Sequence, residues 1–439
     1  MAMPVAPTRS PALSLVAPFF MAAPLALVVA GLLLATSGPA IFVAINEPRT
    51  VAITHATVIG WLTTSIMGAI YQLGPAVLGG RLVSHRLARV QFVVHVVSVP
   101  LFVWSIAEWN ITAMSLAGVG VVVSFTLFLI NAFPAVWGGR GNWTLPRAYL
   151  SMALVFVAAT ASVGITWVGD LEHLWFPITM GRLSGHAHLG LVGWLALTVM
   201  GASYQLVPMF NVITKRETRA GWPVLGWTAL SAALFATLMM TDPAPALRIV
   251  LAVALAAGPA AWGLDMLRMM RSRSRRNLDV QGRATFAALA FLLGALVLGL
   301  FAAVGTPFTA DEEPARWLLA YAAAGILGWV GLTLVGNSYK ILSFLVWYHR
   351  YRPRAGREPI PVIADIYSDR WASYVLFGHG MAAALLALSA VTGWIDLFRA
   401  GGLLLATAAL LHGLSLAHIV FASHTRRTSP APFAKVAAQ

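Results

Sequence analysis

Residues 54–75 read THATVIGWLTTSIMGAIYQLGP, and residues 187–208 read AHLGLVGWLALTVMGASYQLVP. The two stretches align without a gap at an offset of 133 residues. Neither contains Lys, Arg, Asp or Glu, and about 20 such residues suffice for a helix to cross a bilayer. They therefore predict two membrane-spanning helices at equivalent places in an internal repeat. The matching pairs include His55 and His188, Gly60 and Gly193, Trp61 and Trp194, Met67 and Met200, Gly68 and Gly201, Tyr71 and Tyr204, Gln72 and Gln205, and Pro75 and Pro208.

A third, weaker copy of the stretch follows about 135 residues later. It keeps Gly328, Trp329, Gly336 and Tyr339, whereas Lys340 replaces the glutamine, and the position of the histidine falls on Ala323. Small residues spaced along one helical face permit close approach of another helix or of a flat cofactor. We therefore expect three successive four-helix units, arranged as a pseudo-threefold bundle. Their approximate bounds are 14–137, 148–268 and 284–422.

The composition places the whole chain in lipid. Of its 439 residues, 59% are hydrophobic and 10% are charged, and the mean hydropathy is +0.79, so the chain lacks the polar surface of a water-soluble globule. We predict an all-α integral membrane protein with one transmembrane domain over residues 1–439 and about twelve spans. The predicted spans are 14–36, 51–76, 88–109, 113–137, 148–169, 186–210, 222–241, 246–268, 284–305, 316–347, 372–394 and 400–422.

The positive charges predict the orientation of the chain. The N-terminal tail, the loops after even-numbered spans and the C-terminal tail hold 23 of the 29 Lys and Arg residues. By the positive-inside rule, this side faces the cytoplasm. We expect a multi-pass protein of the bacterial cytoplasmic (inner) membrane with both termini in the cytoplasm. Because the charges interrupt apolar runs, the net charge of +14 indicates topology and gives no reason to expect nucleic-acid binding.

The chain contains no cysteine, which excludes disulfides, thiolate metal sites and covalent attachment of c-type haem. A metal ion or a haem would need His, Met, Tyr or carboxylate ligands. Ionisable residues inside a membrane are expensive and usually have a function, and neutral imidazole is a common metal and haem ligand. Histidines within the spans are therefore the first candidates for a site.

Twelve helices in three units, with histidines near the outer ends of the second and sixth, resemble subunit I of the haem-copper oxidase superfamily. That superfamily includes the terminal oxidases and the nitric oxide reductases. The resemblance implies a haem ligand at His55 on helix two. It also implies a copper ligand at His188 or His186 on helix six. The chain departs from the family because residues 222–241, where two copper-binding histidines are expected, contain none.

A second departure concerns helix ten. Active family members carry haem ligands near its outer end, but the histidine of this region is His349 at the cytoplasmic end. The chain is therefore not expected to reduce oxygen or to reduce nitric oxide by the family's mechanism. The resemblance implies a divergent member that lacks the binuclear-centre ligands.

The cofactor-binding candidates are His55, His188 and His186. At ~1.5 Å rise per residue, all three fall within about two turns of the external surface. His186 and His188 are two residues apart, so their side chains diverge by roughly 200° on a helix and cannot face one ligand unless the helix begins between them. We expect the repeated position, His188, to face inward. The alternative is that these histidines only form hydrogen bonds to neighbouring helices.

Other polar residues recur deeper in the bundle. His379 and His412 on helices eleven and twelve could bind a metal or could be structural donors. Tyr71, Tyr204, Tyr339 and Lys340 near the cytoplasmic ends could line a proton or quinone path, whereas the tyrosines could instead form an interfacial aromatic belt. Lys340 would require a carboxylate or lipid-phosphate partner.

These observations predict a haem- or metal-binding polytopic membrane protein with the oxidase subunit I fold. Haem b is the expected cofactor, with copper as the alternative. We expect electron transfer, or handling of nitric oxide and respiratory stress, with electrons from a quinol or a periplasmic donor. Such a chain could be an oxidoreductase. One alternative is transport or assembly of haem or copper. Another is a cofactor-free structural subunit, with a respiratory partner subunit or a homo-oligomer as its context.

Overall fold

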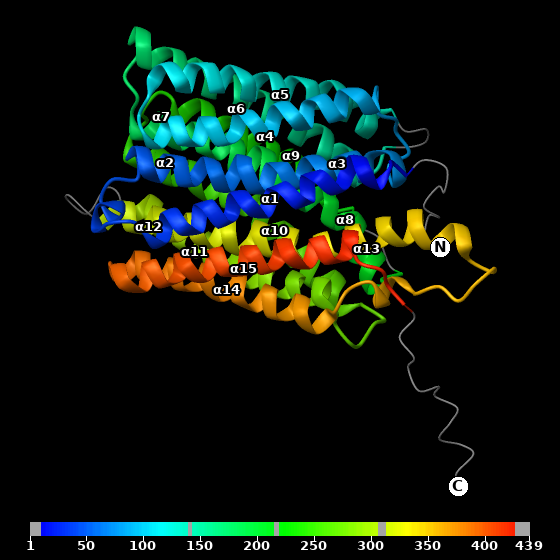
Figure 1. Cartoon of the computed structure of the whole chain (residues 1–439). Coiled ribbons are helices and arrows are strands. Elements are labelled where there is room, and N and C mark those ends of the chain that lie inside the picture. Colours follow the sequence, from blue (N-terminus) through cyan, green and yellow to red (C-terminus); the bar gives the residue numbers. More distant parts are fainter. Residues whose placement is uncertain (1–9, 139–142, 215–218, 306–312, 426–439) are drawn as a thin grey trace.

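The computed structural model describes residues 10–138, 143–214, 219–305 and 313–425. Within these ranges the chain has 12 helices long and apolar enough to cross a bilayer, and they run side by side in one bundle (Figure 1). The prediction of an all-helical chain with about twelve helices of membrane-spanning length and apolarity is thus confirmed for the described residues. The nine helices outside the repeated stretches are α1 (Leu13–Ala35), α4 (His85–Ala107), α5 (Ile111–Trp137), α6 (Leu145–His173), α9 (Gly221–Met239), α10 (Pro245–Arg271), α11 (Val280–Gly305), α14 (Asp369–Thr392) and α15 (Ile395–Phe421).

The other three spans, here called the inner helices, contain the repeated stretches. In the 18-residue apolar stretch of each inner helix, 72%, 83% and 61% of the stretch is buried. The value for any other span in the described ranges is at most 56%, so the inner helices form the core of the bundle. Each changes from α to π geometry and back. The segments are α2 (Pro48–His55), η2 (Ala56–Thr63) and α3 (Thr64–Ala76), then α7 (Met180–His188), η3 (Leu189–Ala196) and α8 (Leu197–Asn211), then α12 (Glu313–Ala322), η4 (Ala323–Gly331) and α13 (Leu332–Val346).

All three inner helices begin earlier than the sequence pattern predicts, the third of them at Glu313. The second span begins at Pro48 and the sixth at Met180, because Pro at the first turn and the Thr179 side chain, which accepts a hydrogen bond from the Arg182 N–H, favour helix initiation there. His186 and His188 therefore both lie within a helix. The helix does not begin between them, and their side chains diverge as the helical spacing requires.

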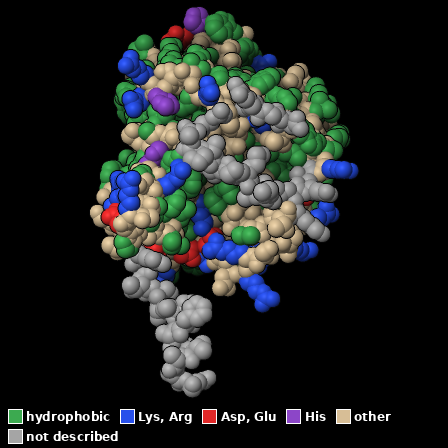
Figure 2. Space-filling model, turned by 90° about the vertical axis from the view of Figure 1, so that its right-hand side faces the viewer, with side chains coloured by type: hydrophobic (Ala, Val, Ile, Leu, Met, Phe, Trp, Pro, Cys, Tyr) green, Lys and Arg blue, Asp and Glu red, His purple; other side chains and the backbone are tan. Residues whose placement is uncertain are grey.

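The start of α1 and the end of α15 lie at the same end of the bundle, here called the terminal face (Figure 1). Seen from this side, Lys and Arg side chains gather around the helix ends, with fewer Asp and Glu (Figure 2). The opposite face carries the N-terminal ends of α2, α7 and α12, and hence the histidines of the repeated stretches.

The π segments occupy equivalent places in the three inner helices. η2 and η3 begin directly after His55 and His188, and η4 begins at Ala323, the corresponding position of the third copy. η4 contacts both η2 and η3, so the inner helices meet at the level of their π segments. A π turn replaces the regular i→i+4 bonds with i→i+5 bonds, such as that from the Thr64 N–H to the Ile59 carbonyl, and inside lipid every backbone group needs a partner within the protein.

The repeated glycines are covered by helices that precede the inner helices in the chain. A Cβ at Gly60 would lie 2.7 Å from Ala26 of α1, and a Cβ at Gly193 would overlap the Phe156 ring of α6. Phe291 of α11 covers Gly328 in the same way. The glycine faces are therefore helix-packing surfaces and leave no slot for a flat cofactor.

Gly193→Ala should destabilise the protein by roughly 1–3 kcal/mol, because the added methyl overpacks the contact with Phe156. Gly226→Ala on α9 is the matched control, since its Cβ would meet no atom within 4 Å. Thermal unfolding in mild detergent should give a lower Tm for the first variant and an equal or higher Tm for the second. Equal effects would contradict the assigned packing.

Candidate functional site

The His55 imidazole is held in one orientation at the end of α2. Its Nδ1 donates a hydrogen bond to the Val51 carbonyl at 2.8 Å, and the ring packs edge-on against Phe102 of α4, with 5.6 Å between ring centroids. Donation from Nδ1 places the lone pair on Nε2. A carbonyl that binds the far nitrogen in this way is the usual support of a metal-ligating histidine.

His188 has the same local arrangement in the second inner helix. Its Nδ1 donates to the Ser184 carbonyl at 2.8 Å, and its ring lies 4.5 Å from that of Phe235 on α9. The residues contacted by His55 and His188 are thus themselves equivalent in the repeat. His188 differs in that Nε2 lies 3.3 Å from the Tyr321 hydroxyl of α12. Both nitrogens of His188 therefore have partners within the bundle.

His186 faces a different neighbour. Its ring packs against Trp167 of α6 at 4.9 Å, next to Gly164, and its buried Nδ1 has no hydrogen-bond partner within the described protein. His55 lies near enough that a positive charge on its ring would disfavour a positive charge on His186. Among the three predicted ligands, the structure thus associates His55 with His186. His188 turns instead toward α9 and α12.

The side chains that could bind a ligand at the face opposite the terminal face are the imidazoles of His55 and His186. A group of three or more His, Asp or Glu side chains able to hold a metal ion does not occur among the described residues. Two imidazole nitrogens can provide axial ligands to a haem iron or two ligands to copper. A flat porphyrin could not lie against Gly60 or Gly193, because Ala26 and Phe156 cover them.

His379 and His412 lie close enough to interact electrostatically, but each has its own donor role. Nε2 of His379 donates to the Leu327 carbonyl at 3.0 Å, within the π segment η4. Nε2 of His412 donates to the Ser338 hydroxyl at 2.9 Å. These contacts direct both Nε2 atoms at protein acceptors, while the buried Nδ1 of His412 has no hydrogen-bond partner within the described protein, so a metal site at this pair stays a prediction.

A chain of hydrogen bonds connects Tyr71 with the first π segment. The Tyr71 hydroxyl donates to Gln91 at 3.2 Å, the Gln91 amide donates to Ser124 at 3.1 Å, and Ser124 contacts His95 Nδ1 at 3.0 Å. His95 Nε2 then reaches Thr64 at 2.9 Å, and the Thr64 hydroxyl donates to the carbonyl of Ile59 in η2. The Ile59 carbonyl therefore accepts this hydroxyl in addition to the Thr64 backbone N–H.

The repeated tyrosines do not form a belt at the lipid interface. Tyr71, Tyr204 and Tyr339 are 0%, 7% and 1% exposed, so the belt interpretation is wrong for these side chains. Each packs among neighbouring helices: Tyr204 lies against Tyr149 at 5.6 Å, and Tyr339 lies against His412 at 5.4 Å. Tyrosines near the ends of spans usually face the lipid headgroups. These three lie instead on inner helices that are surrounded by other helices.

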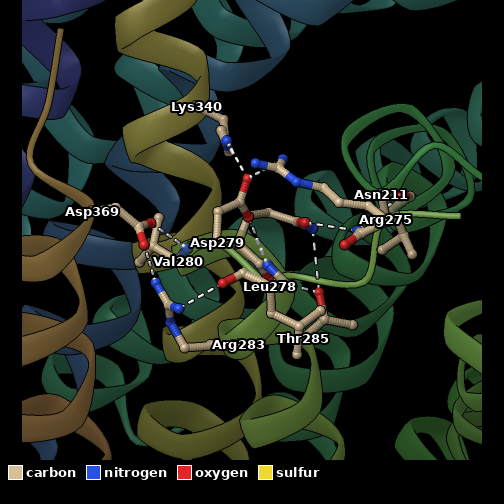
Figure 3. Close-up of polar contacts among 12 residues, drawn as sticks. Asn211, Arg275, Leu278, Asp279, Val280, Arg283, Thr285, Lys340 and Asp369 are labelled. Carbon is tan, nitrogen blue, oxygen red and sulfur yellow. Dashed lines mark hydrogen bonds and ion pairs between the residues drawn. The ribbon is translucent and has the colours of Figure 1, made fainter. Parts of the chain in front are cut away.

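Lys340 forms a partly buried ion pair with Asp279, the residue before α11. The Lys340 Nζ lies 2.5 Å from an Asp279 carboxylate oxygen, with side-chain exposures of 13% and 8%. Arg275 binds the same carboxylate at 2.6 Å, and Arg283 pairs with Asp369 alongside (Figure 3). The carboxylate partner expected for Lys340 is thus present.

The Asp279 carboxyl is ionised because of these neighbours. Burial opposes its ionisation, but hydrogen bonding and charge from Lys340, with the Gly282 N–H and Arg275, lower its pKa below the ordinary 3.8. Burial, followed by the charges of Asp279 and Asp369, raises the pKa of Tyr367 beside this cluster. The cluster therefore holds its charges at neutral pH.

The sequence pattern singles out Lys340 and Tyr71 but not the residues that bind them, Asp279 and Gln91. Asp279 and Gln91 are separated from Lys340 and Tyr71 by a complete span or a loop, so no helical spacing connects them. Asp265 was another available signal. It is a carboxylate within α10, and an acid inside a span alone suggests a buried partner.

No known protein-family model matches this chain, and no curated protein has a matching sequence.

Asp279→Asn should lower the free energy of unfolding by roughly 1.5–3 kcal/mol at neutral pH, because it removes charged hydrogen bonds. The folded-state pKa lies below 3.8, so this stabilisation is present above pH 3.8 and is lost as the pH falls through the folded-state pKa. Unfolding in detergent should show the wild-type advantage shrinking below pH 3.8. Asp396→Asn, in an exposed pair with Arg399, should change stability by less than about 1 kcal/mol. An advantage that persists at low pH would contradict the assignment.

His379→Leu should destabilise the protein by roughly 1–3 kcal/mol, since it leaves the Leu327 carbonyl without this donor. His379→Gln retains an N–H donor and should recover part of the loss. His418→Leu, at an exposed position of α15, is the control. If all three variants unfold at the same temperature, His379 does not support η4.

Proposed function

We propose that this chain holds a haem b or a metal ion through His55 and His186 at the face opposite the terminal face. We infer electron transfer, or the handling of nitric oxide under respiratory stress, as its role. The observation that carries the proposal is the orientation of His55. Its Nδ1 donates to the Val51 carbonyl, which leaves Nε2 as the free ligand atom. His186 contributes a second buried nitrogen without a protein partner.

The proposed fold is that of the haem-copper oxidase subunit I, with three four-helix units. Three observations support it. Each inner helix carries a π segment at the equivalent place. The first helix of each proposed unit covers the equivalent glycine. The histidine and phenylalanine pairs, His55 with Phe102 and His188 with Phe235, occur at the same offset as the repeat.

The proposed location is the bacterial cytoplasmic membrane, with the terminal face in the cytoplasm. The Lys and Arg side chains around that face support this orientation (Figure 2). The histidine site would then face the periplasm, within reach of a periplasmic electron donor. A quinol that diffuses in the bilayer is the other donor class.

The two imidazoles of His55 and His186 are a donor set that suits a haem iron. A bound haem b would supply reversible one-electron transfer. The chain's own residues fix the ligand: Val51 orients the His55 ring, and Phe102 packs against its edge. His186 would provide the second nitrogen, and Trp167 of α6 packs against its ring.

Copper handling is the second candidate, favoured by the same two imidazoles. His55 and His186 lie near each other on two inner helices, and two imidazoles would suit an ion of low coordination number that is bound and then released. Electron transfer requires a cofactor that is reversibly reduced in place. Transport or assembly requires a site that exchanges its metal.

His55→Ala and His186→Ala should each lower bound iron or copper by at least about tenfold, because loss of a ligand or its support typically costs 10–100-fold in affinity. Elemental analysis of purified, equally folded protein measures this. His85→Ala at the start of α4 is the control and should retain full metal content. His188→Ala should have a smaller effect, since both of its nitrogens have protein partners. Unchanged metal in both site variants would overturn the proposal.

A further inference from the structure

A cavity of about 60 Å³ lies between the inner helices, on the terminal-face side of their π segments. α3, α8 and α13 all contribute to its wall. Most lining residues are apolar, but each of the three helices also supplies hydroxyl or amide groups. These polar residues are Ser65, Thr198, Ser203, Thr333, Asn337 and Ser338.

Two polar atoms in this wall lack partners. Asn337 donates from its amide nitrogen to the Thr333 carbonyl at 2.8 Å, but its Oδ1 is buried without a hydrogen bond, as is the Thr198 hydroxyl. An unpaired buried polar atom destabilises a protein by about 1–3 kcal/mol unless water satisfies it. Both atoms therefore favour a hydrated cavity.

A second cavity, of about 10 Å³, lies beside the first. Ser203, Thr333 and Asn337 line both cavities, so the two meet at these residues. Its wall adds Thr285 and Trp262, whose buried indole N–H has no partner in the described protein. A volume of about 10–15 Å³ suffices for one water molecule, which would accept from Trp262.

Polar contacts continue from the second cavity to the terminal face. The Gln281 amide donates to Thr285 at 3.2 Å, and Asn211 donates to Gln281 at 2.9 Å. Figure 3 places Thr285 and Asn211 in the same group of contacts as the Lys340–Asp279 pair. Lys340 is also one helical turn from Asn337 on α13.

We propose that the two cavities form one internal chamber that binds water and is entered from the terminal face beside the Lys340–Asp279 pair. The first cavity would hold on the order of four water molecules, if each occupies about 15 Å³ of accessible space. The chamber delivers water and other small polar molecules to the middle of the bundle. It is separate from the histidine site and does not depend on the proposed cofactor.

The lack of native cysteine allows a direct test of hydration. Ala202→Cys on α8 and Ala69→Cys on α3 each place one thiol in the chamber wall. Ala233→Cys on α9, at an exposed position of a span, is the lipid-facing control. Detergent-purified variants are treated with silver ions, then denatured, and the remaining thiol is titrated with a maleimide.

Silver binds the thiolate, and apolar surroundings keep a thiol protonated. Both chamber variants should therefore react at least about tenfold faster than the control, since one unit of thiol pKa already changes the thiolate fraction tenfold. Two chamber positions on different helices guard against one variant misfolding. If the folded chamber variants react no faster than Ala233→Cys, the cavities are dry and the proposal is wrong.

Discussion

Lipid cannot satisfy polar groups, so each backbone and side-chain group within the spans must find a partner in the protein. The π segments of the inner helices depart from the regular helical ladder, and side chains add further hydrogen bonds to their carbonyls. His379 donates to a carbonyl of η4, and a hydrogen-bond chain through His95 and Thr64 reaches a carbonyl of η2. Buried histidines in this chain thus have two kinds of role. Some donate hydrogen bonds to backbone carbonyls, as His379 does, and others have a ring nitrogen without a protein partner, as His186 does.

The same inner helices set the position of the candidate site. Their glycines let α1, α6 and α11 pack closely, and their π segments meet in the centre of the bundle. His55 stands directly before η2 and is oriented by its own helix, through the Val51 carbonyl. The free Nε2 of His55 is therefore a consequence of helix geometry, while the neighbouring ring of His186 comes from the second inner helix. At the other end, Lys340 and Asp279 tie α13 to the start of α11.

Much of the fold could be predicted from the sequence because apolar runs of spanning length are an unambiguous signal of membrane helices. The first residues of the second and sixth spans, Pro48 and Met180, could not be predicted, because the first turns of these helices contain polar residues and resemble loops. The divergence of His186 and His188 follows from helical spacing, but the proximity of His186 to His55 depends on tertiary packing. The burial of Tyr71 and the Asp279 partner of Lys340 likewise depend on contacts between distant parts of the chain.

The most direct test of the histidine site is a reduced-minus-oxidised visible spectrum of the purified wild-type protein, combined with iron and copper analysis of the same sample. Sharp haem b bands with stoichiometric iron, reversible on reoxidation, are the result that electron transfer through a His55-ligated haem predicts. Copper without haem bands would favour the metal-handling alternative. A featureless spectrum with neither metal would contradict the site and leave the histidines with structural roles alone.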